Sequence, residues 1–211
     1  MNRMINSRTG VCTILLVAVL GGGAAEATAA ATGSEQLPAG YSLNGTGNRG
    51  DFDFLAGAWT TQQRRLKARG VGSVEWNDSP PNVHCATRYL DGAVIAEESY
   101  SPTKTVSGLF LYAFDIAKRQ WSLYWIDPKS GKLDSPLVGG FVHERGEFYG
   151  EDVEDGRPIK VRYSWIKRDA DHARWEQAYS FDNKTWETNW ISEFARADPA
   201  SSCVTKGQIS K

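Results

Sequence analysis

The sequence is poor in the side chains that bind metals. Its 211 residues include three histidines and three cysteines. Zinc and haem iron are held mainly by these two residue types, and His84, His143 and His172 stand far apart in the chain. We therefore expect neither a metal site nor a bound cofactor.

Other absences exclude further classes of protein. The chain has no Gly-x-Ser-x-Gly segment, the strained turn that presents the nucleophile of many serine hydrolases. Its 24 basic and 25 acidic residues nearly balance, and no basic stripe stands out, so nucleic acid is not an expected partner. No segment alternates strands with long helices, which argues against a parallel α/β fold.

No apolar run is as long as a membrane-spanning helix. The run Val11–Leu20 has about ten residues, whereas a spanning helix needs about twenty. Arg3 and Arg8 precede it, and small residues with Ala-x-Ala spacing follow. This order predicts a bacterial Sec-type signal peptide over residues 1–30, with a membrane anchor as the alternative. The mature protein is then periplasmic or secreted, with no stable membrane insertion.

The mature chain divides into three parts. Residues 31–50 are rich in Gly, Ser and Asn and are interpreted as a flexible leader. Residues 51–197 are long enough for one domain with its own core, and residues 198–211 are interpreted as a flexible tail. Cys85 and Cys203 remain once the signal peptide is removed, and they are either a disulfide or two separate thiols.

From Phe52 onward the chain reads as ten or eleven strand-like runs separated by short turns. The last two lie in ARWEQAYSFDNKTWETNW, with a turn at Asp182–Lys184. Short links imply antiparallel pairing of neighbours, and closure of the sheet removes its exposed edges. The prediction is an all-β fold, a single antiparallel up-and-down barrel of about 8–11 strands.

Strand residues alternate between two faces, and one face collects tryptophans together with a few polar side chains. That face predicts a ligand cavity, mostly apolar with polar handles. The alternative is a packed core filled by aromatic side chains. In the last hairpin, alternation places Trp186, Thr188 and Trp190 inward and Glu187 and Asn189 outward. The predicted ligand-binding residues are Gln63, Arg65, Trp125, Tyr163, Trp175, Gln177, Thr188 and Trp190.

Candidate acids are weaker signals. Glu147, Glu151 and Glu176 each read more simply as members of a solvated outer face. Asp127 shares the alternation of Trp125 and stands at a strand end, so it is the best single candidate for a catalytic acid.

The segment FDFLAGAW resembles the start of the calycin barrels, the lipocalins and fatty-acid-binding proteins. This resemblance implies that Gly57 and Trp59 open the first strand and that Trp59 plugs the closed end. It also implies that Arg196, in EFAR, packs over that tryptophan.

Longer segments, among them RQWSLYWID, GEFYGED and GRPIKVRYSW, are similar to an uncharacterised family of bacterial calycin-like domains of unknown function. That resemblance covers Phe52 to Arg196. FDFLxGxW alone also resembles the nitrobindin-type haem barrels, which implies an inward histidine on a late strand. The chain has no histidine after His172.

Four functional hypotheses follow. The first is an exported lipocalin-like barrel that binds a small hydrophobic or aromatic molecule by stacking on Trp125, Trp175 and Trp190. The second is a cofactor-independent isomerase, lyase or cyclase in the same cavity, with Asp127 or Tyr163 as the acid–base residue and Arg65 stabilising an oxyanion. The third is a haem-binding barrel, and the fourth is a packed envelope protein without a ligand.

Overall fold

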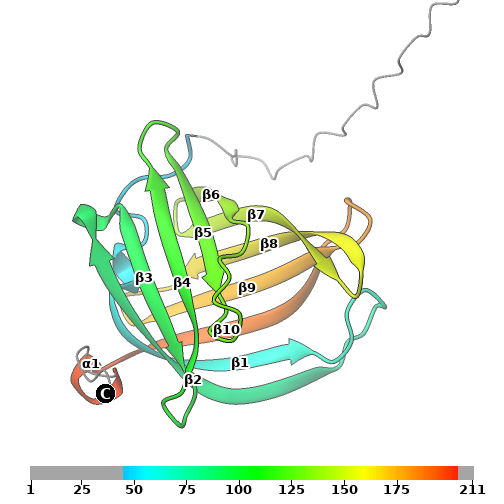
Figure 1. The fold of residues 1–211 in the computed structure, drawn as a ribbon, viewed down its shortest axis with the longest axis horizontal. Coiled ribbons are helices and arrows are strands. Elements are labelled where there is room, and N and C mark those ends of the chain that lie inside the picture. The colour runs from blue at the N-terminus through cyan, green and yellow to red at the C-terminus, as the bar shows by residue number, and fades with distance from the viewer. Residues whose placement is uncertain (1–44, 204–211) are drawn as a thin grey trace, which may run out of the picture. The chain divides into compact units, whose positions relative to one another are not determined.

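The computed structural model describes residues 45–203, so the predicted signal peptide lies outside the described residues. Ten strands form one closed barrel in which chain neighbours are paired and antiparallel, and β1 also pairs with β10 (Figure 1). The predicted all-β, up-and-down barrel is confirmed, and it is consistent with a calycin-like fold. The strands are β1 (Gly57–Leu66), β2 (Trp76–Tyr89), β3 (Val94–Tyr100), β4 (Val106–Asp115), β5 (Gln120–Ile126), β6 (Leu137–Val142), β7 (Arg145–Glu154), β8 (Arg157–Lys167), β9 (His172–Ser180) and β10 (Glu187–Ala197).

Two predicted runs merge into the long strand β2. β2 continues through Pro80 and Pro81. The pairing of β1 with β2 shifts there by one residue, between Thr61 and Gln63. Proline has no N–H to give to a ladder and is tolerated at such a bulge. The barrel therefore has ten strands, which is within the predicted range.

Aromatic residues fill one end of the barrel. The short helix η1 (Asp53–Leu55) follows Phe52, whose ring is fully buried and packs against Tyr112, Trp121 and Phe141 at centroid distances of 4.6–5.1 Å. Rings at these distances add about 0.5–1.5 kcal/mol per pair beyond burial. This end is closed.

Trp59 and Arg196 pack against each other at the closed end of the barrel. The Trp59 side chain is fully buried, and the Arg196 guanidinium lies 3.7 Å from the centre of its ring. Arg196 also donates hydrogen bonds to the carbonyls of Phe54 and Ala56, both at 2.9 Å. Gly57 has φ +109°, a conformation that favours glycine, and an added Cβ would lie 3.5 Å from Arg196 Nη1. Arg196 thus packs over Trp59 as the resemblance implied.

A bulge in β10 inverts the predicted alternation of the last hairpin. The register with β9 shifts between Thr188 and Trp190, so Asn189 is the extra residue. Thr188 pairs with Ala178, on the outer face next to the inward Gln177. The inward placement of Thr188 was therefore wrong, as was the outward placement of Asn189, which is 1% exposed.

The remaining elements are short. A second helix, η2 (Leu90–Gly92), links β2 to β3, and α1 (Pro199–Ser202) follows β10. Within residues 45–203, no helix has the length and apolar character needed to cross a membrane. Part of the predicted leader is described: the Gly45 and Gly47 amides each donate, at 2.9 Å, to carbonyls of Lys118 and Arg119 in the β4–β5 turn.

Candidate functional site

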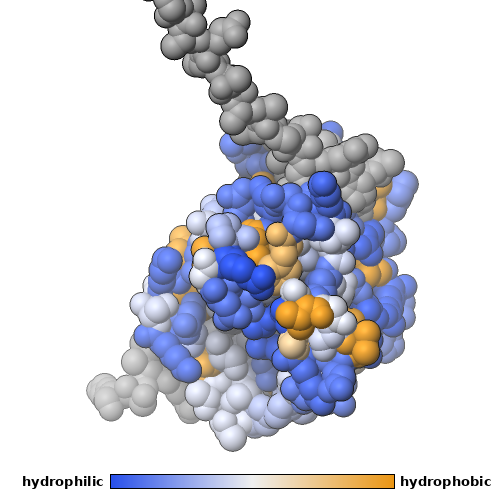
Figure 2. All heavy atoms as spheres, turned by 90° about the vertical axis from the view of Figure 1, so that its right-hand side faces the viewer, coloured by the Kyte–Doolittle hydropathy of each residue, from blue (hydrophilic) through white to orange (hydrophobic). Residues whose placement is uncertain are grey.

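A cavity of about 100 Å³ lies inside the barrel and opens at the end opposite the plug. Its walls come from every strand except β6 and β7. Figure 2 shows one face of the molecule, on which small apolar patches lie among hydrophilic residues. The lining residues are Gln63, Arg65, Asn82, His84, Glu97, Ser99, Ser107, Phe110, Trp125, Trp165, Trp175, Trp190, Ser192 and Phe194.

Three of the predicted tryptophans form the aromatic wall. Trp175 and Trp190 meet edge to face, with centroids 5.1 Å apart. Trp125 packs on Phe110 at 4.6 Å, and its ring lies so close to Gly108 that an added Cβ would be 2.0 Å away. The glycine thus makes room for the indole, and the wall offers flat surfaces for a planar ligand.

Arg65 stands at the mouth of the cavity. Its guanidinium lies 3.3 Å from the centre of the Trp190 ring, and burial lowers the pKa of this guanidinium. Arginine remains protonated because its ordinary pKa is above about 12. No hydrogen bond or ion pair to Arg65 is found within residues 45–203, so its donors are available to a ligand.

Gln63 holds the wall in place. Its side-chain oxygen accepts a hydrogen bond from Trp190 Nε1 at 3.2 Å, and its amide nitrogen donates to Thr61 Oγ1 at 3.0 Å. Gln63 lines the cavity as expected. Because both polar atoms have protein partners, its role is to orient Trp190 as much as to contact a ligand.

Two predicted site residues face a neighbouring cavity instead. Tyr163 and Gln177 line a second space of about 120 Å³, which shares Trp125 with the first. Gln177 Nε2 donates to Asn189 Oδ1 at 2.9 Å, and burial raises the pKa of Tyr163. The predicted residues therefore do not all line one space, and Trp125 belongs to the walls of both.

Two predicted site residues lie outside both cavities. Thr188 is on the outer face, for the reason given above. The Asp127 carboxylate accepts the Lys129 amide at 2.9 Å and so caps the β5–β6 turn. Asp127 is absent from the walls of either cavity, so an acid–base role for it in this cavity has no structural support.

The acid inside the cavity is Glu97, in a group of side chains that sequence reasoning missed. Glu97 is 1% exposed; its Oε1 lies 2.6 Å from His84 Nδ1, and its other oxygen accepts the Tyr112 hydroxyl. Ser99 Oγ lies 3.5 Å from His84 Nε2 and accepts a 3.3 Å hydrogen bond from Asn82 Nδ2. Burial first, and the Glu97 charge second, raise the pKa of Tyr112 well above its ordinary value. We name these five side chains the floor network.

The signal for this network was present in the β2–β3 hairpin. Adjacent residues of a strand point to opposite faces. This rule places His84 inward once Cys85 points outward. The antiparallel pairing of β2 with β3 places His84 opposite Ser99. Glu97 lies two residues before Ser99 and therefore points to the same face. A histidine facing a glutamate across one hairpin was the missed signal.

None of the other candidate acids lines the first cavity, although Glu151 lines the second space. Glu147 and Glu176 both pair in register with Ser164, on the face opposite Tyr163 and Gln177. Glu147 forms an ion pair with Arg145 at 2.8 Å, and Glu176 is held by Arg174. Glu151 pairs with Lys160. Within the described residues, no group of three or more His, Cys, Asp or Glu side chains could hold a metal ion.

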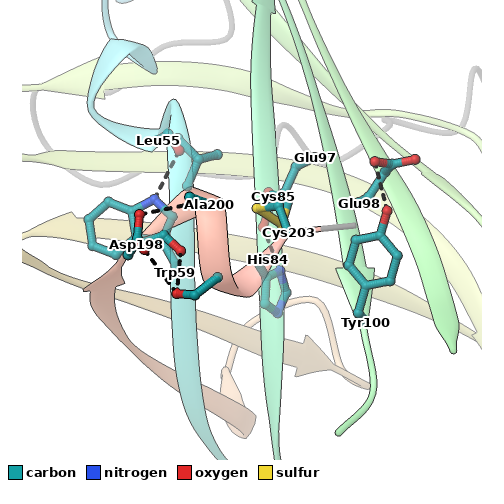
Figure 3. The surroundings of a disulfide bond; sticks show 11 residues. Leu55, Trp59, His84, Cys85, Glu97, Glu98, Tyr100, Asp198, Ala200 and Cys203 are labelled. Carbon is teal, nitrogen blue, oxygen red and sulfur yellow. Dashed lines mark hydrogen bonds and ion pairs between the residues drawn. A yellow bond between two sulfur atoms is a disulfide. The ribbon is translucent and has the colours of Figure 1, made fainter. Parts of the chain in front are cut away.

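A disulfide lies directly outside the floor network. Cys203, which follows α1, is bonded to Cys85 of β2, and Figure 3 shows this bond beside His84 and Glu97. Their Cα atoms are 5.9 Å apart and 118 residues separate them in sequence. The bond therefore ties the C-terminal helix to the strand that carries His84. No known protein family and no curated protein sequence matches this chain.

Proposed function

We propose that this protein is an exported lipocalin-like barrel that binds a small, planar, largely apolar molecule carrying one acidic group. The observation that carries the proposal is the pairing of Trp190 with Arg65 at the mouth of an aromatic cavity. The indoles supply apolar contact area. Arg65 supplies a cation with unused hydrogen-bond donors, the usual partner of a carboxylate.

The size of the cavity limits the ligand. Drug-sized ligands fill pockets of roughly 300–1,000 Å³, whereas an apolar cavity of roughly 150 Å³ accepts benzene. At about 100 Å³, this cavity is smaller than that one, so it encloses at most one aromatic ring, and a second ring and the polar end extend into the open mouth. The connected void also counts against the packed-barrel alternative.

Two features support export. The order of charged, apolar and small residues at the start of the sequence is that of a signal peptide. The Cys85–Cys203 disulfide fits an oxidising compartment, because cytosolic thiols are kept reduced. The expected partner is a small aromatic molecule that reaches the barrel outside the cytoplasm.

The test is a calorimetric titration of the mature protein with 2-naphthoate and with its uncharged analogue naphthalene-2-carboxamide. We expect Arg65→Gln to weaken 2-naphthoate binding about tenfold, equivalent to about 1.4 kcal/mol, and to leave carboxamide binding nearly unchanged. Equal losses for both compounds, or no binding of either by the wild type, would contradict the proposal.

Arg64 provides a matched control. It neighbours Arg65 in β1 but lies on the outer face, where its guanidinium is 4.9 Å from the centre of the Trp76 ring. Both arginines thus stack on a tryptophan, and only one lines the cavity. We expect Arg64→Gln to change 2-naphthoate affinity by less than about twofold.

A further inference from the structure

The floor network has the arrangement of a nucleophile with its activating base. In such sites a hydroxyl lies within hydrogen-bond reach of a histidine, which is itself oriented by a carboxylate, and the distances are often looser without substrate. Here the order is Ser99, His84 and Glu97, at 3.5 Å and 2.6 Å. All three line the cavity, so the group faces the space that a ligand would enter.

Hydrogen bonding fixes the proton positions that this chemistry needs. Glu97 accepts from Tyr112, so its carboxylate is held from both sides, and it lies within 2.6 Å of His84 Nδ1. A proton on Nδ1 leaves a lone pair on Nε2, the nitrogen that is next to Ser99. Asn82 donates to Ser99 Oγ, so the Ser99 hydroxyl proton is free to point at His84.

Asn82 also supplies a donor for the charge that would form. Attack on an ester creates an oxyanion close to the nucleophile, and a side-chain amide aimed at that position stabilises it. The Asn82 amide nitrogen is 3.3 Å from Ser99 Oγ and has a second hydrogen. The phenyl ring of Phe194, 5.0 Å from the His84 ring, closes one side of this space.

We propose that Ser99, His84 and Glu97 give the barrel an acyl-transfer activity toward small aromatic esters. Ser99 Oγ forms a bond to the ester carbonyl carbon while its proton moves to His84 Nε2. The bond from that carbon to the alcohol oxygen breaks, and the alcohol leaves with the proton from His84. Water then attacks the acyl group through the same base, which releases the carboxylic acid and restores the Ser99 hydroxyl.

Phenylmethanesulfonyl fluoride, a small aromatic reagent, tests this proposal directly. An activated serine forms an oxygen–sulfur bond with it and releases fluoride, and the adduct is seen in the intact protein mass and located by peptide mapping. We expect one adduct, on Ser99, absent in Ser99→Ala and formed at least about 100-fold more slowly in His84→Gln. Glu97→Gln should also slow labelling, because it removes the carboxylate that orients His84.

Two substitutions away from the cavity serve as controls. Ser122→Ala removes a serine on the outer face of β5, and His172→Gln removes an exposed histidine. Neither should change the labelling rate. The proposal fails if the wild type is not labelled, if the adduct lies on another residue, or if His84→Gln is labelled as fast as the wild type.

The same protein samples separate this proposal from the proposed function on which it builds. Circular dichroism and urea denaturation of Ser99→Ala show whether that variant is folded, and the wild type is titrated with 2-naphthoate in parallel. Binding of 2-naphthoate without labelling would overturn the acyl-transfer activity alone. Labelling of Ser99 without 2-naphthoate binding would overturn the proposed ligand class and leave the activity standing.

Discussion

The polar side chains of the floor network are held by one another across neighbouring strands. Glu97 is the extreme case, since a carboxylate at 1% exposure is tolerated only with good hydrogen bonds. It has two, one from β2 and one from β4. A buried network with every member satisfied rigidifies its surroundings, and here those surroundings are the floor of the cavity.

Removal of the Tyr112 hydroxyl tests this view of Glu97. Tyr112→Phe leaves the carboxylate with one partner in a buried site, and we expect a loss of about 1–3 kcal/mol in the free energy of unfolding, measured by urea denaturation. Tyr163→Phe is the matched control, because no hydrogen bond of the Tyr163 hydroxyl is found within residues 45–203. Similar losses in the two variants would argue that the Glu97 bond is unimportant.

At the scale of single elements, turns and bulges decide which side chains meet. The β9–β10 hairpin turns on Asp182, whose carboxylate accepts the amides of Lys184 and Thr185, both at 2.8 Å. These backbone hydrogen bonds, that of Thr185 first, lower the pKa of Asp182. The turn is therefore stabilised by the ionised carboxylate.

This gives a pH-dependent prediction for the hairpin. The pKa of Asp182 is lower in the folded than in the unfolded protein, so its stabilisation is present above the unfolded value of about 4 and is lost as the pH falls below it. We expect the melting temperature of Asp182→Asn to lie below that of the wild type at pH 7. The difference between the two melting temperatures should be smaller at about pH 2. A constant difference across that range would show that the charge of Asp182 does not matter.

The individual strands show which parts of the site could be predicted from the sequence. Period-two alternation found the faces of β1, β5 and β9, and so placed Arg65, Trp125 and Trp175 correctly at the cavity. It failed in β10 because Asn189 is an extra residue in the strand. The residues before it therefore point to the faces opposite to those predicted. Such a bulge leaves no mark in composition, and only the register with β9 reveals it.

The floor network was missed for a different reason. His84 and Glu97 are 13 residues apart in sequence and become neighbours only through the β2–β3 pairing. Asp127 was the predicted acid because it shares the alternation of Trp125, but that pattern reflects one strand alone. Pairing each inward residue with its cross-strand partner would have found Glu97.

For the whole molecule, the disulfide ties the C-terminal end of the described chain back to β2. Cross-linking residues 118 apart restricts the unfolded chain, and we expect the Cys85→Ser, Cys203→Ser double variant to lose about 2–4 kcal/mol of unfolding free energy in urea. Because the bond lies outside the barrel, 2-naphthoate affinity should change by less than about twofold. A large loss of affinity in the folded double variant would show that the bond shapes the cavity.

The tryptophans report on the whole barrel at once, because the chain has eight of them. Trp59 and Trp121 belong to the buried core near the closed end, and Trp76 and Trp186 lie beneath Arg64 and Arg162 outside the cavity. The four that line the cavity are Trp125, Trp165, Trp175 and Trp190.

The most direct test of the proposed function is therefore a titration of the mature protein with 2-naphthoate, followed through the indole N–H signals of all eight tryptophans by NMR. The ring current of a bound naphthalene should shift the signals of Trp125, Trp175 and Trp190 most and leave those of Trp76 and Trp186 in place. Saturable shifts confined to Trp76 or Trp186, or no saturable shift at all, would contradict ligand binding inside the barrel.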